Sequence, residues 1–159
     1  MCDPIQSSAA SGPIYDAELV QKGTQMTHPV RMEGLTLTVV DVAASVDYYC
    51  KQLGLFKLEW NAAPQFAMLR VIDGAATLGL LSWTEAEKEG AERLSHAQAR
   101  AVHVEFSTVD LDGLYADLLA KGVVIDVPPH DEPWERAMTA FDPDGYSVEI
   151  AQGRRGKKE

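Results

Sequence analysis

The sequence predicts an α+β protein made of two tandem β-α-β-β-β modules whose curved mixed sheets surround a cleft. The first observation is a repeat: two parts of the chain show the same order of elements, and Asp41 overlies Asp110 at an offset of 69 residues. The second is the turn motif Asp142-Pro143-Asp144-Gly145, which precedes an alternating strand and is typical of a hairpin. The third is size, because 159 residues with 46% hydrophobic content can bury the core of such a fold.

The first module is expected over residues 31–83. Alternation and β-branched residues predict its first strand, and Asp41 is a suitable N-cap for the helix that follows. Gly54 is placed to end that helix in a left-handed conformation. The predicted elements are a strand at 35–40, a helix at 43–53 and strands at 55–60, 65–72 and 76–83.

The second module is expected over residues 101–152, with Asp110 as the N-cap and Gly122 as the end of its helix. The predicted elements are a strand at 101–107, a helix at 111–121, a strand at 123–127, a loop at 128–133 and closing strands at 134–141 and 146–151. In each module the first and fourth strands run in the same direction, so they can lie side by side.

A linker over residues 84–100 should join the modules. Its start, Thr84-Glu85-Ala86-Glu87, fits a capping box for a charged helix that ends near residue 93. Residues 1–30 contain Ser, Gly and Pro without sustained periodicity, which predicts a flexible N-terminal arm. Residues 153–159 are basic and predict a disordered tail.

The net charge of −10 and the pI near 4.8 argue against nucleic acid or an anionic membrane as a partner, because like charges repel. No apolar run approaches the roughly 20 residues that span a bilayer, and the start lacks the pattern of a secretory signal. A cytoplasmic protein is therefore expected. Cys2 and Cys50 cannot build a disulfide framework or a cysteine-rich zinc site.

Several separated motifs occur in a characteristic order along both modules. They are V-x-D-x-x-x-S at Val39, Asp41 and Ser45, then Tyr49, Leu53-Gly54-Leu55, His103-Val104-Glu105-Phe106, and Asp142-Pro143-Asp144-Gly145 followed by Glu149. With these motifs, residues 33–152 resemble the vicinal oxygen chelate superfamily. That superfamily includes glyoxalase I, extradiol dioxygenases, methylmalonyl-CoA epimerase, fosfomycin-resistance enzymes and bleomycin-resistance proteins. The resemblance implies the glyoxalase-like fold but leaves the reaction open, because members range from isomerases and dioxygenases to proteins that only bind.

The resemblance also implies metal ligands on the first and last strands of each module. His103 and Glu149 stand at these positions in the second module, and such a pair suits Zn, Ni, Mn or Fe. The corresponding positions in the first module are Gly34 and Gly79, which have no side chain to donate. We therefore predict an incomplete metal site, with no cofactor or a weakly held divalent metal.

His103 and Glu149 are also the candidate catalytic residues, and two readings without metal stay open. Glu149 in a largely apolar cleft would have a raised pKa and could exchange a proton with the substrate, with His103 orienting it. Alternatively, the two side chains only hydrogen-bond to each other. Further candidates for substrate binding offer hydroxyl, charged or aromatic groups, or space in the floor of the cleft. They are Thr36, Thr38, Gly79, Glu105, Ser147, Trp134 and Arg136.

The leading functional hypothesis is a small-molecule-binding protein of the glyoxalase/bleomycin-resistance type that acts by sequestration or by metal-free chemistry. The alternative is a divalent-metal-dependent lyase, isomerase or dioxygenase that uses His103 and Glu149. A third possibility is a structural module whose cleft is filled by side chains. A homodimer is expected, and the cleft could be built within one chain or across two subunits.

Overall fold

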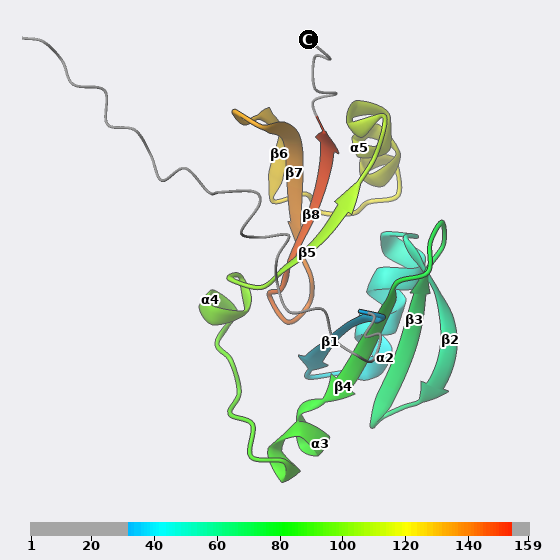
Figure 1. Cartoon of the computed structure of the whole chain (residues 1–159), viewed down its shortest axis with the longest axis vertical. Coiled ribbons are helices and arrows are strands. Elements are labelled where there is room, and N and C mark those ends of the chain that lie inside the picture. The colour runs from blue at the N-terminus through cyan, green and yellow to red at the C-terminus, as the bar shows by residue number, and fades with distance from the viewer. Residues whose placement is uncertain (1–31, 154–159) are drawn as a thin grey trace, which may run out of the picture. The chain divides into compact units, whose positions relative to one another are not determined.

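Two four-stranded mixed sheets form the framework of residues 32–153, the part of the chain that the computed structural model describes (Figure 1). The first sheet has the order β1-β4-β3-β2, with β1 (Gly34–Val39), β2 (Phe56–Ala62), β3 (Phe66–Val71) and β4 (Thr77–Ser82). The second has the order β5-β8-β7-β6, with β5 (His103–Ser107), β6 (Val127–Asp131), β7 (Glu135–Phe141) and β8 (Ser147–Gly153). The predicted α+β fold of two β-α-β-β-β modules is confirmed. The predicted arm at 1–30 lies outside the described residues, as does the predicted tail beyond Gly153, which itself ends β8.

The two sheets have the same pairing, as the repeat predicts. β1 and β4 are parallel with Gly34 opposite Thr77, and β5 and β8 are parallel with His103 opposite Ser147. The remaining neighbours in each sheet are antiparallel. His103 therefore occupies in the second sheet the place of Gly34 in the first.

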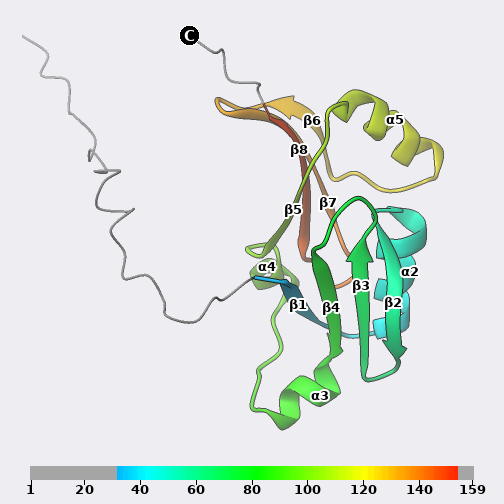
Figure 2. The ribbon, with the colours of Figure 1, turned by 45° about the vertical axis from the view of Figure 1, so that its right-hand side comes forward.

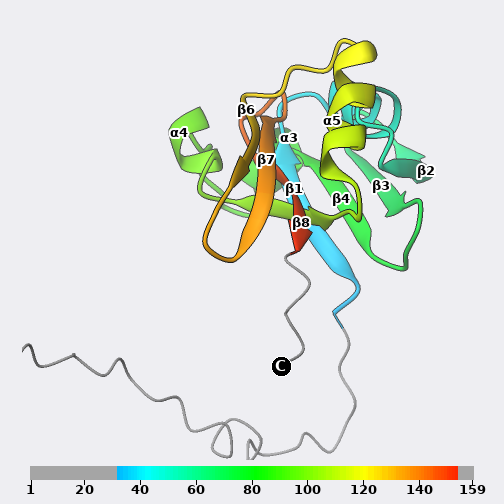
Figure 3. The ribbon, with the colours of Figure 1, turned by 90° about the horizontal axis from the view of Figure 1, so that it is seen from above.

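One helix covers one face of each sheet. The helix of the first module is α2 (Val42–Asp47), which packs against β3 and β4 (Figure 2). The helix of the second is α5 (Leu111–Ala120), which packs against β7 and β8 (Figure 3). Asp41 and Asp110 cap them as predicted, because each side chain accepts backbone N–H groups of the first turn. Gly54 and Gly122 end the helical segments with φ of +70° and +77°, a region that favours glycine.

The helix predicted at 43–53 is α-helical only in its first half. After α2 the chain continues as the π-helical segment η1 (Tyr48–Gln52). Tyr48 and Tyr49 at its start are both buried and stand edge to face, with ring centroids 5.2 Å apart. Aromatic contacts continue from Tyr49 to Phe56 and from Phe56 to Phe106 on β5. The helix-bearing sides of the two modules therefore share one hydrophobic core.

Two predicted segments were wrong. The strand predicted at 123–127 is in fact β6 (Val127–Asp131), which includes the Pro128-Pro129 pair that had indicated a loop. β6 is an edge strand whose pairing with β7 shifts between Val127 and His130, and prolines are tolerated at such edges because one side of the strand needs no donor.

The second error concerns the linker. Its helix α3 (Trp83–Lys88) begins earlier than predicted, with Ser82 rather than Thr84 as the N-cap. The capping box lies instead at Ser95 and Gln98, where it starts the short helix α4 (His96–Ala99). No helix among the described residues is long and apolar enough to cross a membrane.

The predicted Asp142-Pro143-Asp144-Gly145 turn joins the two modules. Gly145 has a φ of +92°, and Asp142 Oδ1 accepts the backbone N–H groups of Asp144 and Tyr146, as turn chemistry predicts. Three further hydrogen bonds reach the first module from this hairpin. They run from Tyr49 Oη to Asp142 Oδ2 (2.9 Å), from Val40 N to Asp144 Oδ1 (2.8 Å) and from Tyr146 Oη to Thr38 O (2.9 Å).

Candidate functional site

The face of each sheet that carries no helix is called its open face. Residues that lie directly opposite one another on neighbouring strands share a face, and alternate residues along a strand do as well. On the second sheet Glu105 lies opposite Glu149, and Glu149 lies opposite Thr139. Two residues earlier on both strands, and therefore on the same face, His103 lies opposite Ser147. The structure thus brings together, on the open face of the second sheet, four residues that the sequence singled out.

His103 and Glu149 are in contact. His103 Nδ1 lies 3.2 Å from Glu149 Oε2, which is within hydrogen-bonding distance. The His103 side chain is 45% exposed and that of Glu149 is 23% exposed, so solvent reaches both. The mutual pairing considered from the sequence is therefore the arrangement observed, and the imidazole is positioned to hold the Glu149 carboxylate in one orientation.

A pocket of about 310 Å³ lies beside this pair on the same open face. Its lining residues are Glu105, Phe106, Ser107, Glu135, Glu149, Ala151 and Gly153. Three of them carry carboxylates, and none of these described residues is a lysine, arginine or histidine. All the described lining residues belong to the second module, so this pocket is not the predicted cleft between the two sheets. Its lining is also acidic rather than largely apolar.

Glu135 is a residue that the sequence reasoning missed. It begins β7 and lies opposite Gly153, the last residue of β8. Alternation along β7 places it on the same face as Thr139, the neighbour of Glu149. Extending the strand pattern backwards from the hairpin would have found it, because Glu135 lies within the strand predicted at 134–141.

The open face of the first sheet has no side chain at the two glycine positions. A β-carbon on Gly79 would lie 2.6 Å from Thr36 Oγ1 and 3.2 Å from the ring of Phe66. That ring also contacts Trp60, with centroids 5.6 Å apart. A β-carbon on Gly34 would overlap the carbonyl oxygen of Thr77. Gly79 was predicted to enlarge the floor of the cleft, but Phe66 and Thr36 occupy the space over it.

The donor groups do not form a complete metal site. Among residues 32–153, no group of three or more His, Cys, Asp and Glu side chains is arranged to hold a metal ion. Zinc sites with three or four protein ligands are the norm, whereas His103 and Glu149 supply two that face each other. Residues 32–153 of one chain therefore do not by themselves complete the divalent-ion site that the family resemblance implied.

Two other predicted residues lie elsewhere. Arg136 is opposite Gln152, whose side chain accepts the N–H of Leu111 at the start of α5, so Arg136 is on the helix-bearing face. It donates to Asp112 Oδ1 (2.9 Å), and this hydrogen bond raises the pKa of the guanidinium. Trp134 precedes β7 and is 66% exposed.

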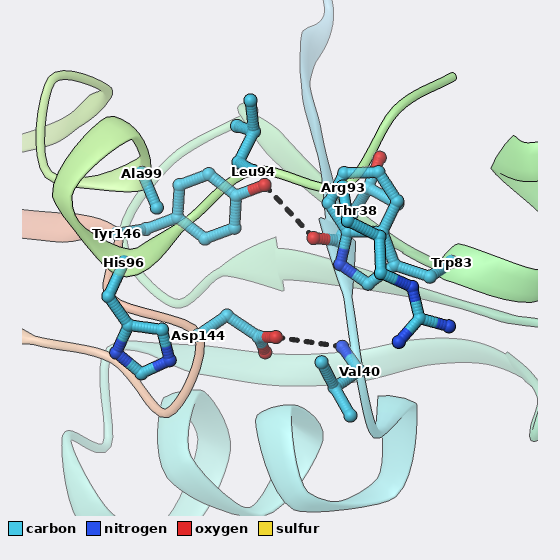
Figure 4. A pocket seen from close by; sticks show the side chains of 9 residues that line it. All are labelled: Thr38, Val40, Trp83, Arg93, Leu94, His96, Ala99, Asp144 and Tyr146. Carbon is cyan, nitrogen blue, oxygen red and sulfur yellow. Dashed lines mark hydrogen bonds between the residues drawn. The ribbon is translucent and has the colours of Figure 1, made fainter.

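Thr38 lines a second, smaller pocket of about 60 Å³ (Figure 4). The residues around it come from β1, the linker and the hairpin; they are Thr38, Val40, Trp83, Arg93, Leu94, His96, Ala99, Asp144 and Tyr146. Two of the hydrogen bonds that join the modules run across this space, from Val40 N to Asp144 and from Tyr146 Oη to Thr38 O. Burial raises the pKa of Asp144. Pockets for organic ligands usually measure about 300–1,000 Å³, so this one suits a few water molecules.

The comparisons with known proteins agree with the motifs. The model of the Glyoxalase/Bleomycin resistance protein/Dioxygenase superfamily matches residues 30–150. The uncharacterized protein YraH of Bacillus subtilis (strain 168) is 34% identical over 123 residues, which cover 73% of this chain and 93% of YraH. The resemblance to this superfamily, inferred from the motifs, is thereby confirmed.

Solved structures show the same fold. A glyoxalase/bleomycin resistance protein/dioxygenase from Nocardioides has a TM-score of 0.67 and 27% identity, over 87% of this chain and 93% of that one. TnmS3, an antibiotic binding protein from Streptomyces sp. CB03234, has a TM-score of 0.62 and 20% identity, over 82% and 100%. Lactoylglutathione lyase from Agrobacterium tumefaciens has a TM-score of 0.64 and 20% identity, over 83% and 100%. At these identities the last two support the fold alone.

Proposed function

The chain belongs to the glyoxalase/bleomycin resistance protein/dioxygenase superfamily, and from this premise we propose that it binds a small organic molecule with a cationic group on the open face of the second sheet. The observation that carries this proposal is the lining of the larger pocket. Glu105, Glu135 and Glu149 supply three carboxylates there, and among the described lining residues no basic side chain balances them. An amine or guanidinium group of the ligand would provide that balance.

The size of the pocket suits a small organic ligand, and its charge favours a cationic one. Its volume of about 310 Å³ is at the lower end of the usual range for organic ligands. Carboxylates that line one concavity also focus a negative potential, which attracts cations and is relieved when one binds. Binding of this kind would serve either sequestration or a metal-free reaction. In such a reaction Glu149 would exchange a proton with the substrate while His103 orients the carboxylate.

The first test compares hexylamine with hexanol, which has the same chain but no charge. We expect NMR titration to show hexylamine binding near β5 and β8, with hexanol binding more weakly. Glu105→Gln and Glu135→Gln should each weaken hexylamine binding by roughly two- to fivefold, the size expected for a solvent-exposed ion pair worth up to about 1 kcal/mol. Added salt should weaken the native interaction, because it screens exposed charges.

Glu92→Gln is the matched control, since it removes the same charge from an exposed position between α3 and α4. It should leave hexylamine binding unchanged. Equal binding of hexylamine and hexanol, or the same loss in the Glu92 variant, would contradict a cation site in this pocket.

We further propose that the protein works without a resident divalent ion and as a homodimer. Native mass spectrometry of the untagged protein tests both points together. The expected mass is about twice the 17.4 kDa of one chain, without stoichiometric metal. Melting scans with Mn, Fe, Co, Ni and Zn should show little stabilisation, because a metal that binds only the folded state must raise the melting temperature. Stoichiometric metal with such a rise would favour the alternative, a metal-dependent lyase, isomerase or dioxygenase that uses His103 and Glu149.

A further inference from the structure

Arg100 lies on the open face of the second sheet, at the end farther from the pocket that Glu105, Glu135 and Glu149 line. Its guanidinium carbon is 4.2 Å from the centroid of the Phe141 ring. Phe141 lies opposite Ser147, and Ser147 lies opposite His103, so the ring belongs to the row of the open face that contains His103. Glu135 marks the other end of the same strand, β7.

Arg100 differs from the other described arginines in its partners. Arg70, Arg93 and Arg136 each pair with a carboxylate, at N–O distances of 2.7, 2.7 and 2.9 Å. The contact of Arg100 is with the aromatic ring, and no described residue accepts a hydrogen bond from its guanidinium. Arg100 is thus a positive charge on the open face whose hydrogen-bond donors are not used by any residue in 32–153.

Stacking leaves the guanidinium ready to bind an anion. Its five N–H donors point outward in the plane of the group, whereas the contact with a ring uses the flat face. A carboxylate or phosphate group can therefore accept two parallel hydrogen bonds from the edge while the ring holds the plane in place. Phe141 acts as the support and Arg100 as the recognising group.

We infer that the ligand carries an anionic group as well as a cationic one, and that Arg100 binds the anion. This inference rests on the proposed function, because the same open face holds both ends of the ligand. Side chains of one face repeat about every 7 Å along a strand, so the row of Glu105 and Glu149 lies roughly 7 Å from the row of Phe141. By the same spacing Glu135 lies about 20 Å from it. The ligand class is therefore an extended zwitterion whose charges are separated by more than those of a simple α-amino acid.

The probe for this inference is 6-aminohexanoate, whose amine and carboxylate lie at opposite ends of a flexible chain. Hexylamine and hexanoate each retain one of the two charges. NMR titration of the native protein should show the tightest binding for 6-aminohexanoate. Arg100→Gln should weaken that binding by roughly two- to fivefold, and it should leave hexylamine binding unchanged or slightly tighter because a repelling cation is gone.

Arg93→Gln is the control, because it removes the same charge from an arginine that is already paired with Glu87. It should not weaken binding of 6-aminohexanoate, and melting curves of both variants verify that they fold. If 6-aminohexanoate binds no tighter than hexylamine, or if the two arginine variants behave alike, the role of Arg100 is overturned while the cation site stands. If hexylamine does not bind at all, the cation site fails. In that case hexanoate tests Arg100 separately: its role as the anion-binding residue stands only if hexanoate binds the native protein and does not bind the Arg100→Gln variant.

Discussion

Tyr49→Phe is expected to lower the free energy of unfolding by about 1.5–3 kcal/mol, the range for a buried hydrogen bond to a charged group. Tyr49 is fully buried, and its hydroxyl donates to Asp142 Oδ2 at 2.9 Å. Asp142 is only 4% exposed, so water cannot replace the lost donor. The bond also joins the helical segment of the first module to the hairpin of the second. Urea unfolding followed by circular dichroism measures the change.

Tyr48→Phe is the matched control, because it deletes the same atom one residue away. Tyr48 is 6% exposed, and among residues 32–153 its buried hydroxyl has no hydrogen-bond partner. Removing an unsatisfied polar group should leave stability unchanged or raise it slightly. Burial raises the pKa of both tyrosines, so both hydroxyls stay protonated at neutral pH. Similar losses in the two variants would show that the bond to Asp142 is not what stabilises this junction.

The second large effect is a pH dependence centred on Asp142. Burial raises the pKa of this carboxyl above its ordinary 3.8, against the opposing influence of the hydrogen bonds from Tyr49 and Tyr146. The folded protein therefore holds the Asp142 proton more tightly than the unfolded chain does. Its contribution to stability is fully present below pH 3.8 and is lost as the pH rises through the raised pKa of the folded state.

Asp142→Asn should remove this dependence, because an amide does not titrate. We expect the stability of the variant relative to the native protein to increase as the pH rises from below 3.8 into the neutral range. Urea unfolding at several pH values measures this difference. Asp126→Asn is the comparison, since it removes a carboxylate from a more exposed hydrogen bond with the Phe141 N–H. A relative stability of Asp142→Asn that falls as the pH rises would mean that the hydrogen bonds outweigh burial.

The elements that could be predicted from the sequence depend on local chemistry. Asp41 and Asp110 cap helices because a carboxylate next to a helix start accepts free N–H groups in any fold. Gly54 and Gly122 end the helical segments because glycine tolerates a positive φ. The elements that could not be predicted depend on distant neighbours. β6 is a strand despite Pro128 because β7 pairs with it at the edge of a sheet, and no local pattern reveals that partner.

The candidate site divides in the same way. Alternation placed Glu105 on the face of His103, since side chains along a strand have a period of two, and the family resemblance placed Glu149 beside them; the pairing of β5 with β8 agrees. They could not reveal Arg100, which precedes β5 and reaches the open face through Phe141, a residue about 40 positions away on β7. The same holds for Phe66, whose ring lies over Gly79 on the neighbouring strand.

The sequence by itself determined the two modules and the parallel direction of the first and fourth strands in each. These follow from periodicity and capping, which act over a few residues, whereas the family resemblance marked His103 and Glu149 as the positions of metal ligands. The tertiary structure alone decided that Asp142 and Asp144 join the modules, that the pocket is acidic, and that Phe66 lies over Gly79. The physical reason is that burial, charge balance and steric overlap depend on which distant segments meet, and that is settled when the two modules pack on a common core.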